Sequence, residues 1–200
     1  MLITPDVDAI ASLLTSTPGS VIAYPTETFY GLGAVISDHD AIGRIVRIKG
    51  RHAAKGMIVL VSDMTMLSTI AEIDEPARDL LRQFWPGPLS AVFRAKTEVD
   101  PLLAPNGRLA ARISSHPMAY SLVQKAGPIT STSANISGRP PAQDVDTLRA
   151  QGLVLDGILD GGKTPGGKPS TLIDLTLWPP ACLRDGQIPF TEIQNLFQSL

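Results

Sequence analysis

Hydrophobic and polar positions along the chain follow two different periods, and the two periods alternate. Short apolar runs typical of strands lie at residues 21–24, 57–61, 89–95, 108–113, 128–134, 157–160, 170–175 and 181–184. Apolar residues at helical spacing predict helices that begin at Asp6 or Asp8, at Ser37 or Asp38, near 67–70, at 76–85, at 117–125, near 144–150 and from Thr191. Several strands follow one another through short turns, so the pattern predicts an α/β (α+β) fold with a twisted mixed sheet and flanking helices.

Length and composition suit one compact domain. The chain has 200 residues with 44% hydrophobic content, which predicts a single domain over residues 1–200. It contains no apolar stretch of about 18–20 residues and no signal-peptide pattern at its start, so we expect a cytoplasmic protein without a membrane segment. The single cysteine, Cys182, excludes an internal disulfide and a thiolate cluster, and we expect it to be a small apolar filler.

Charge is distributed unevenly. The formal net charge is −2, which does not favour bulk binding to nucleic acid. The segment 41–55 nevertheless contains five basic residues and no acid, which predicts a local site for an anion.

The stretch VIAYPTETFYGLGA at 21–34 begins as a strand buried on both faces and then breaks at Pro25. Hydroxyls on Thr26 and Thr28 and the carboxylate of Glu27 follow, at the end of a strand where α/β sheets often bind ligands. We expect a glycine loop beyond them, in which Gly31 and Gly33 let the backbone approach another group closely. An ordinary strand-to-loop turn with incidental polar residues is the alternative.

Two further segments carry groups that could bind an anion. Lys49 and Arg51 in KGR, with Lys55 nearby, offer charges and a planar fork for phosphate oxygens, although a solvated basic helix end would look the same. The segment 129–140, ITSTSANISGRP, places four hydroxyls in a row, which predicts that they face a ligand or a backbone turn. In it, Asn135 and Gly138 are expected to allow unusual backbone angles and an anion-binding nest.

Several common motifs are absent. The histidines show no metal-ligand spacing, so a structural zinc site is not expected. The sequence also lacks the P-loop, the dinucleotide-binding glycine fingerprint and the nucleophile elbow. This pattern favours chemistry by positioning of reactants over covalent catalysis.

Six motifs together resemble the YrdC/TsaC family of threonylcarbamoyl-AMP synthases, over nearly the whole chain. They are, in order, YPTETFYGLGA, KGR, FWPGPLS, AARISSHP, STSANISG and PSTLIDLT. The resemblance implies a YrdC-like twisted sheet with a central basic cleft, in the short bacterial form. It also implies synthesis of threonylcarbamoyl-AMP and pyrophosphate from ATP, L-threonine and bicarbonate, which makes the chain a nucleotidyltransferase of tRNA modification beside the anticodon.

The resemblance also assigns residues to ligands. It implies threonine contacts at Thr28, Arg112, Ser131 and Ser170. It implies ATP contacts at Lys49, Arg51, Lys55, Ser133, Asn135 and Arg184, with Lys49 and Arg51 as positioning residues and no protein nucleophile.

The implied reaction needs few groups from the protein. The amine of threonine adds to CO2 or bicarbonate, and the resulting carbamate attacks the α-phosphorus of ATP. Mg²⁺ is expected to bind through the phosphates, and no residue is assigned to it. The implied partners are downstream threonylcarbamoyl-transferase proteins and tRNA or double-stranded RNA.

The chain departs from longer family members at three positions, where Lys55 replaces Asn, Leu60 replaces a threonine-contacting His, and Arg108 replaces Thr. Two other functions stay open. One is a non-catalytic RNA-binding module, against which the 5% aromatic content and the hydroxyls beside charge both count. The other is a carbamoyl-adenylate step in the maturation of another metabolite or a metalloenzyme, whose proteins carry extra domains and cysteine-rich segments.

Overall fold

One mixed sheet runs through the molecule. The structure is a computed structural model that describes residues 1–50 and 56–197. The strands of the described residues are β1 (Leu2–Thr4), β2 (Ile22–Tyr24), β3 (Gly31–Gly33), β4 (Ile58–Leu60), β5 (Ala71–Glu72), β6 (Leu89–Ala95), β7 (Arg108–Arg112), β8 (Ile129–Ser133), β9 (Gly157–Leu159), β10 (Thr171–Asp174) and β11 (Ala181–Arg184). Their order is β1-β9-β2-β3-β8-β4-β7-β6-β10-β11, with β5 paired to β6. The sheet contains parallel pairs such as β4 with β7 and antiparallel pairs such as β4 with β8, which confirms the mixed sheet.

The helices begin and end close to the predicted positions. They are α1 (Val7–Ser16), α2 (His39–Lys49), α3 (Met64–Ile70), α4 (Glu75–Arg82), α5 (Pro117–Ala126), α6 (Val145–Gln151) and α7 (Phe190–Phe197), with a short 3-10 helix at Pro105–Gly107. Asp6 and Asp38 cap α1 and α2 by accepting bonds from backbone N–H groups of the first turn. Gly50 ends α2 with a φ of 57°, a left-handed conformation that glycine adopts without strain.

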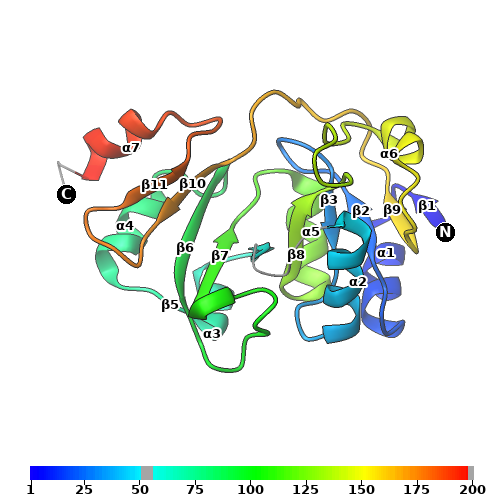
Figure 1. Cartoon of the computed structure of the whole chain (residues 1–200), viewed down its shortest axis with the longest axis horizontal. Helices are drawn as coiled ribbons and strands as arrows, with labels where there is room; N and C mark the ends of the chain where they lie inside the picture. Colours follow the sequence, from blue (N-terminus) through cyan, green and yellow to red (C-terminus); the bar gives the residue numbers. More distant parts are fainter. Residues whose placement is uncertain (51–55, 198–200) are drawn as a thin grey trace.

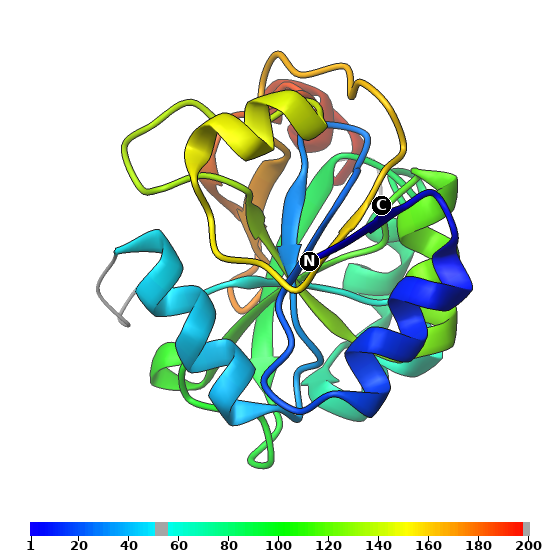
Figure 2. The ribbon, with the colours of Figure 1, turned by 90° about the vertical axis from the view of Figure 1, so that its right-hand side faces the viewer.

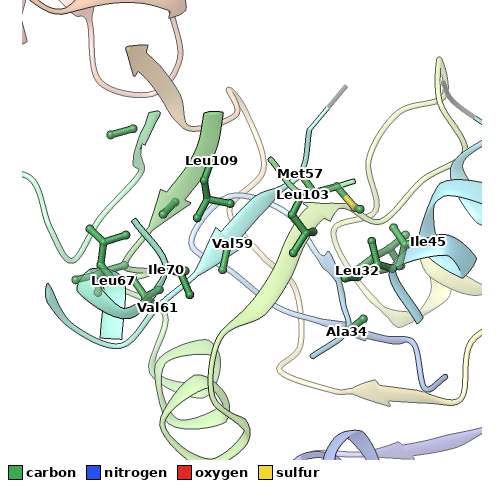
Figure 3. Packing of buried hydrophobic residues seen from close by; sticks show 14 of the residues in the cluster. Leu32, Ala34, Ile45, Met57, Val59, Val61, Leu67, Ile70, Leu103 and Leu109 are labelled. Carbon is green, nitrogen blue, oxygen red and sulfur yellow. The ribbon is translucent and has the colours of Figure 1, made fainter. Parts of the chain in front are cut away.

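Both faces of the sheet are covered by helices in the half that contains β2, β4 and β8. Along β2, Ala23 packs in one cluster with Ile42 and Ile45 of α2, whereas Ile22 and Tyr24 pack in another with side chains of α1 and α5. Figure 3 shows part of the first cluster, including Ile45. Burial on both faces confirms the prediction for this apolar run.

The arrangement leaves one segment crossing between two parts of the sheet. Figure 2 shows α1 and α5 on one side of the strands and α2 on the other. In Figure 1, the segment between β9 and β10 passes over the top of the molecule from one half of the sheet to the other.

Among the described residues, no helix has the length and apolar composition needed to cross a membrane.

Two predictions about the chain's local structure are wrong. Gly31 and Gly33 lie in a strand that pairs antiparallel with β2, and not in a loop. The close approach is made to Tyr24, because a Cβ atom on Gly33 would lie 2.8 Å from Cε1 of its ring. Cys182 is exposed on β11 and fills no core position, because this strand is the last in the sheet order and most of its residues face solvent.

Candidate active site

A cavity of about 830 Å³ lies against β3, β4, β7 and β8, and is bordered by the segments that follow β2 and precede β10. Its volume is in the range of small-molecule sites. Of the ten residues that the sequence assigns to ligands, eight line this cavity: Thr28, Lys49, Arg112, Ser131, Ser133, Asn135, Ser170 and Arg184. The other two, Arg51 and Lys55, lie outside the described residues.

The described side chains around the cavity make it positively charged. Lys49, Arg112 and Arg184 line it, and none of the described lining residues is an aspartate or a glutamate. Burial, together with the positive charge of Arg112, lowers the pKa of Arg184 below its usual value. This mutual repulsion between two guanidinium groups favours an anionic ligand between them.

Arg112 forms a buried ion pair behind the cavity wall. Its side chain is 4% exposed, and its Nη1 lies 3.3 Å from Oε1 of Glu27. The other oxygen of Glu27 accepts a hydrogen bond of 2.5 Å from the hydroxyl of Ser114. Neither Nε of Arg112 nor Oε1 of Glu27 has a hydrogen-bond partner among the described residues. Arg112 thus has a carboxylate on one side, and its guanidinium can pair with a second carboxylate in the cavity that it lines.

Half-buried His116 belongs to the same group of residues. Its backbone N–H donates to the hydroxyl of Ser114 at 3.2 Å. Burial lowers the pKa of its imidazole below the usual value, and the negative charge of Glu27 opposes that shift. The neutral form is therefore favoured at neutral pH.

Hydroxyls complete the same end of the cavity. The Thr28 hydroxyl lies 3.1 Å from that of Thr26, which donates to the carbonyl of Phe29 at 2.7 Å. Fully buried Tyr24 contacts Ser131 through its hydroxyl, which also donates to the carbonyl of Thr130 at 2.9 Å. Burial raises the pKa of Tyr24, while its hydrogen bond with Ser131 opposes the shift, so the phenol stays protonated.

Ser170 connects β6 to the arginine of β11. Its hydroxyl lies 2.9 Å from that of Ser90 on β6 and accepts a bond of 3.1 Å from Nη2 of Arg184. Arg184 also donates to the carbonyl of Ser170 through Nε and Nη2, at 3.1 and 2.9 Å. The guanidinium is thereby fixed at the cavity wall.

Lys49 is used differently, because its ammonium group holds the loop after β8. Its Nζ donates to the carbonyl of Ser133 at 2.5 Å, and to Oδ1 and the carbonyl of Asn135 at 2.9 and 3.1 Å. Oδ1 of Asn135 also accepts a bond of 2.7 Å from the Ser133 hydroxyl. Lys49, although distant in sequence, thus forms one compact polar group with Ser133 and Asn135 beside the cavity.

Some sequence interpretations do not hold at individual positions. Thr130 faces away from the cavity and is bonded to the backbone of β3 and its neighbour, as it donates to the Leu32 carbonyl and accepts from the Ala34 N–H. Gly138 has a φ of 87°, whereas Asn135 is not left-handed and contributes through its side chain.

Other residues that the sequence raised lie away from the cavity. Arg44 of the basic segment pairs with Asp156 at 2.5 Å, because α2 directs it toward the loop before β9. Arg108 forms an ion pair with Asp174, and Leu60 is buried in the cluster beneath α1 and α5.

Sequence reasoning did not assign Glu27, Ser90 or Ser114 to the site. The motif YPTETFYGLGA did contain Glu27, but a carboxylate among threonines gave no sign of its partner. Ser90 and Ser114 act through Ser170 and Glu27, which are distant in sequence. Within the described residues, no group of three or more His, Cys, Asp or Glu side chains is arranged to hold a metal ion.

Comparison with known proteins identifies the family. The family model Sua5_yciO_yrdC, described as telomere recombination, matches residues 16–186. The chain belongs to this family. It is similar to the threonylcarbamoyl-AMP synthase of Pyrococcus abyssi (strain GE5 / Orsay), with 40% identity over 89% of this chain and 54% of that protein. It is also similar to the threonylcarbamoyl-AMP synthase of Coxiella burnetii (strain RSA 493 / Nine Mile phase I), with 39% identity over 78% of this chain and 86% of that protein.

Solved structures of the family share the fold. The structure of P. abyssi Sua5 complexed with L-threonine has a TM-score of 0.89 and 37% identity, covering 95% of this chain and 56% of that one. Escherichia coli YciO has a TM-score of 0.79 and 30% identity, covering 94% of this chain and 95% of that one. The chain thus spans about half the length of the Pyrococcus relative and nearly all of YciO.

Proposed function

We propose that the chain is an L-threonylcarbamoyladenylate synthase, a nucleotidyltransferase that makes threonylcarbamoyl-AMP and pyrophosphate from ATP, L-threonine and bicarbonate. The observation that carries the proposal is the meeting of eight ligand-assigned residues in one cavity with cationic and hydroxyl groups. The names of the relatives and the L-threonine bound to P. abyssi Sua5 support it. We also propose that residues 1–200 form a single domain of a cytoplasmic protein.

The cavity divides into two ends. Thr28, Arg112, Ser131 and Ser170 would bind threonine, since a guanidinium fork suits its carboxylate and hydroxyls suit its polar groups. Lys49, Arg51, Lys55, Ser133, Asn135 and Arg184 would contact ATP. The side chains of Arg112 and Arg184 would then lie near the junction, where their joint positive charge suits the reacting carboxylate and phosphate groups.

In the proposed reaction, the neutral amine of threonine attacks CO2 to give a carbamate, and its proton passes to solvent. With bicarbonate as the carbon source, a C–O bond of bicarbonate breaks and the amine proton leaves with that oxygen as water. A carbamate oxygen then forms a bond to the α-phosphorus of ATP as the bond to pyrophosphate breaks. No protein nucleophile takes part, and the rate arises from alignment of the reactants and from cations near developing charge. Mg²⁺ would bind through the phosphates, which fits the lack of carboxylates among the described lining residues.

The product would serve the threonylcarbamoyladenosine modification of tRNA. The partners would be downstream transferase proteins, together with tRNA or double-stranded RNA that contacts the basic cavity. A non-catalytic RNA-binding module is less well supported, because hydroxyls and cations predominate in the cavity, and Phe29 and Tyr30 are the only aromatic side chains among its described lining residues.

The test is pyrophosphate release by the purified chain with ATP and bicarbonate, with and without L-threonine, together with mass detection of threonylcarbamoyl-AMP. Threonine-dependent release with that product is expected. Release that does not depend on threonine would contradict the synthase proposal. A chain that binds tRNA but binds neither ATP nor threonine would also contradict it. Arg51→Ala should abolish ATP use and leave the fold intact, which circular dichroism can check.

A further inference from the structure

Glu27 lies between two residues of the cavity wall but directs its carboxylate behind that wall. Thr26 and Thr28 line the cavity, whereas Glu27 does not, and its side chain is 14% exposed. Its Oε1 has no hydrogen-bond partner among the described residues, although it faces the guanidinium of Arg112 at 3.3 Å. A buried charge is costly unless it is paired and hydrogen-bonded, and Glu27 is paired with Arg112 and hydrogen-bonded to Ser114.

The contacts fix this carboxylate in one place. The hydroxyl of Ser114 donates to Oε2 at 2.5 Å and itself accepts from the backbone of His116, so the carboxylate is held from the side away from the cavity. The other oxygen, Oε1, faces the guanidinium of Arg112, which lines the cavity and has a side chain that is 4% exposed. Glu27 therefore places a fixed negative charge directly behind the residue proposed to bind the threonine carboxylate.

This charge matters because the cavity is otherwise lined by cations in its described part. Lys49, Arg112 and Arg184 would attract any small carboxylate, whether or not it carries an amine. An α-amino acid is a zwitterion, with an ammonium group two bonds from its carboxylate carbon. A negative charge behind Arg112 lowers the attraction for a plain carboxylate and favours the ammonium group, so it adds discrimination that the cations alone do not have.

We propose that Glu27 is a specificity-determining residue that makes the threonine end of the cavity select a zwitterionic amino acid over the same carboxylate without its amine. The proposal rests on the proposed function, because it takes threonine as the ligand. Glu27 acts through Arg112 and through its charge, and does not touch the substrate.

The test compares two ligands in calorimetric titrations of the full chain: L-threonine and (R)-3-hydroxybutyrate, which lacks the α-amine. The charge of Glu27 acts with opposite sign on the ammonium group and on the carboxylate of a ligand, so Glu27→Gln should lower the threonine preference by about tenfold. The change should combine weaker threonine binding with equal or tighter binding of hydroxybutyrate.

Two further variants separate charge from shape. Glu27→Asp keeps the charge and loses reach to Ser114, so it should retain most of the preference even if both affinities fall. Glu75→Gln removes an exposed carboxylate that lies 3.5 Å from Arg78, and should leave the preference unchanged. A purely structural role of Glu27 would instead weaken both ligands equally in the Gln and Asp variants.

The outcomes distinguish the two proposals. If the unmodified chain binds no threonine, the proposed function fails, whatever Glu27 does. If it binds threonine and Glu27→Gln leaves the ratio of the two dissociation constants unchanged, the role of Glu27 is refuted and the synthase proposal stands. A fall in the ratio for Gln but not for Asp supports the role.

Discussion

The two ends of the cavity contain equally buried cations that are used in opposite ways. Lys49 and Arg112 are each 3% exposed. Lys49 donates to oxygens of Ser133 and Asn135 and thereby fixes the loop after β8. Arg112 has one carboxylate beside it and an Nε without a partner among the described residues. The comparison teaches that equally buried cations can be used differently, because the ammonium of Lys49 holds the cavity wall by several hydrogen bonds, whereas the guanidinium of Arg112 has one carboxylate beside it.

The largest expected effect comes from removing Arg112, the cation at the proposed threonine end of the cavity. Arg112→Met leaves Glu27 as an uncompensated buried carboxylate, so the free energy of unfolding should fall by about 3–5 kcal/mol. Urea unfolding measures the change. Adding Glu27→Gln to Arg112→Met should recover much of it. Arg82→Met, which breaks an exposed pair with Asp79, should change stability by less than about 1 kcal/mol. An equally small change for Arg112→Met would refute the contrast.

Removal of the lysine should have a smaller effect on stability and a different effect on ligands. Lys49→Met leaves carbonyl and amide oxygens of the loop after β8 without their donor, which should cost about 2 kcal/mol of unfolding free energy. ATP binding should be lost while threonine binding is kept, as calorimetry can show. Lys125→Met, at an exposed pair with Asp8, is the matched control. Equal loss of both ligands would contradict the division of the cavity.

Removal of the Ser170 hydroxyl should weaken threonine binding more than ATP binding. Ser170→Ala breaks the contacts with Ser90 and Arg184, which should lower the free energy of unfolding by about 1 kcal/mol and weaken threonine binding by about tenfold. Ser12→Ala, at an exposed position of α1, should leave both quantities unchanged. A tenfold loss of ATP affinity with unchanged threonine affinity would place Ser170 at the other end.

The smallest expected effect is a dependence of stability on pH that arises from His116, near the proposed threonine end of the cavity. Burial lowers the pKa of His116, so the unfolded chain binds this proton more readily than the folded protein does. Well above pH 6.5, His116 is uncharged in both the folded and the unfolded chain. The free energy of unfolding falls as the pH drops through that value. The chain should lose slightly more unfolding free energy between pH 7.5 and 5.5 than His116→Asn does. Equal losses would contradict the shift.

The sequence predicted the elements that depend on local pattern. The strand 89–95 and the helix start at Ser37 or Asp38 follow from apolar runs and short-range hydrogen bonds, and the structure has the strand at Leu89–Ala95 and the cap at Asp38. The strands β1 and β3 were missed because their stability comes from partners. Leu2–Thr4 pairs with β9, far along the chain, and Gly31–Gly33 forms a strand because glycine lets the backbone lie against Tyr24.

The sequence by itself determined the fold class, the family and the kinds of groups in the cavity, because hydrophobic period and motif order are local properties of the chain. Only the tertiary structure decided how those groups are used. The pairing of Glu27 with Arg112, the support of Ser170 by Ser90 and the attachment of Lys49 to the Ser133 loop join residues 80 or more positions apart. Charge and hydrogen bonding act through space over a few ångströms, so their outcome is fixed by folding and not by neighbouring letters.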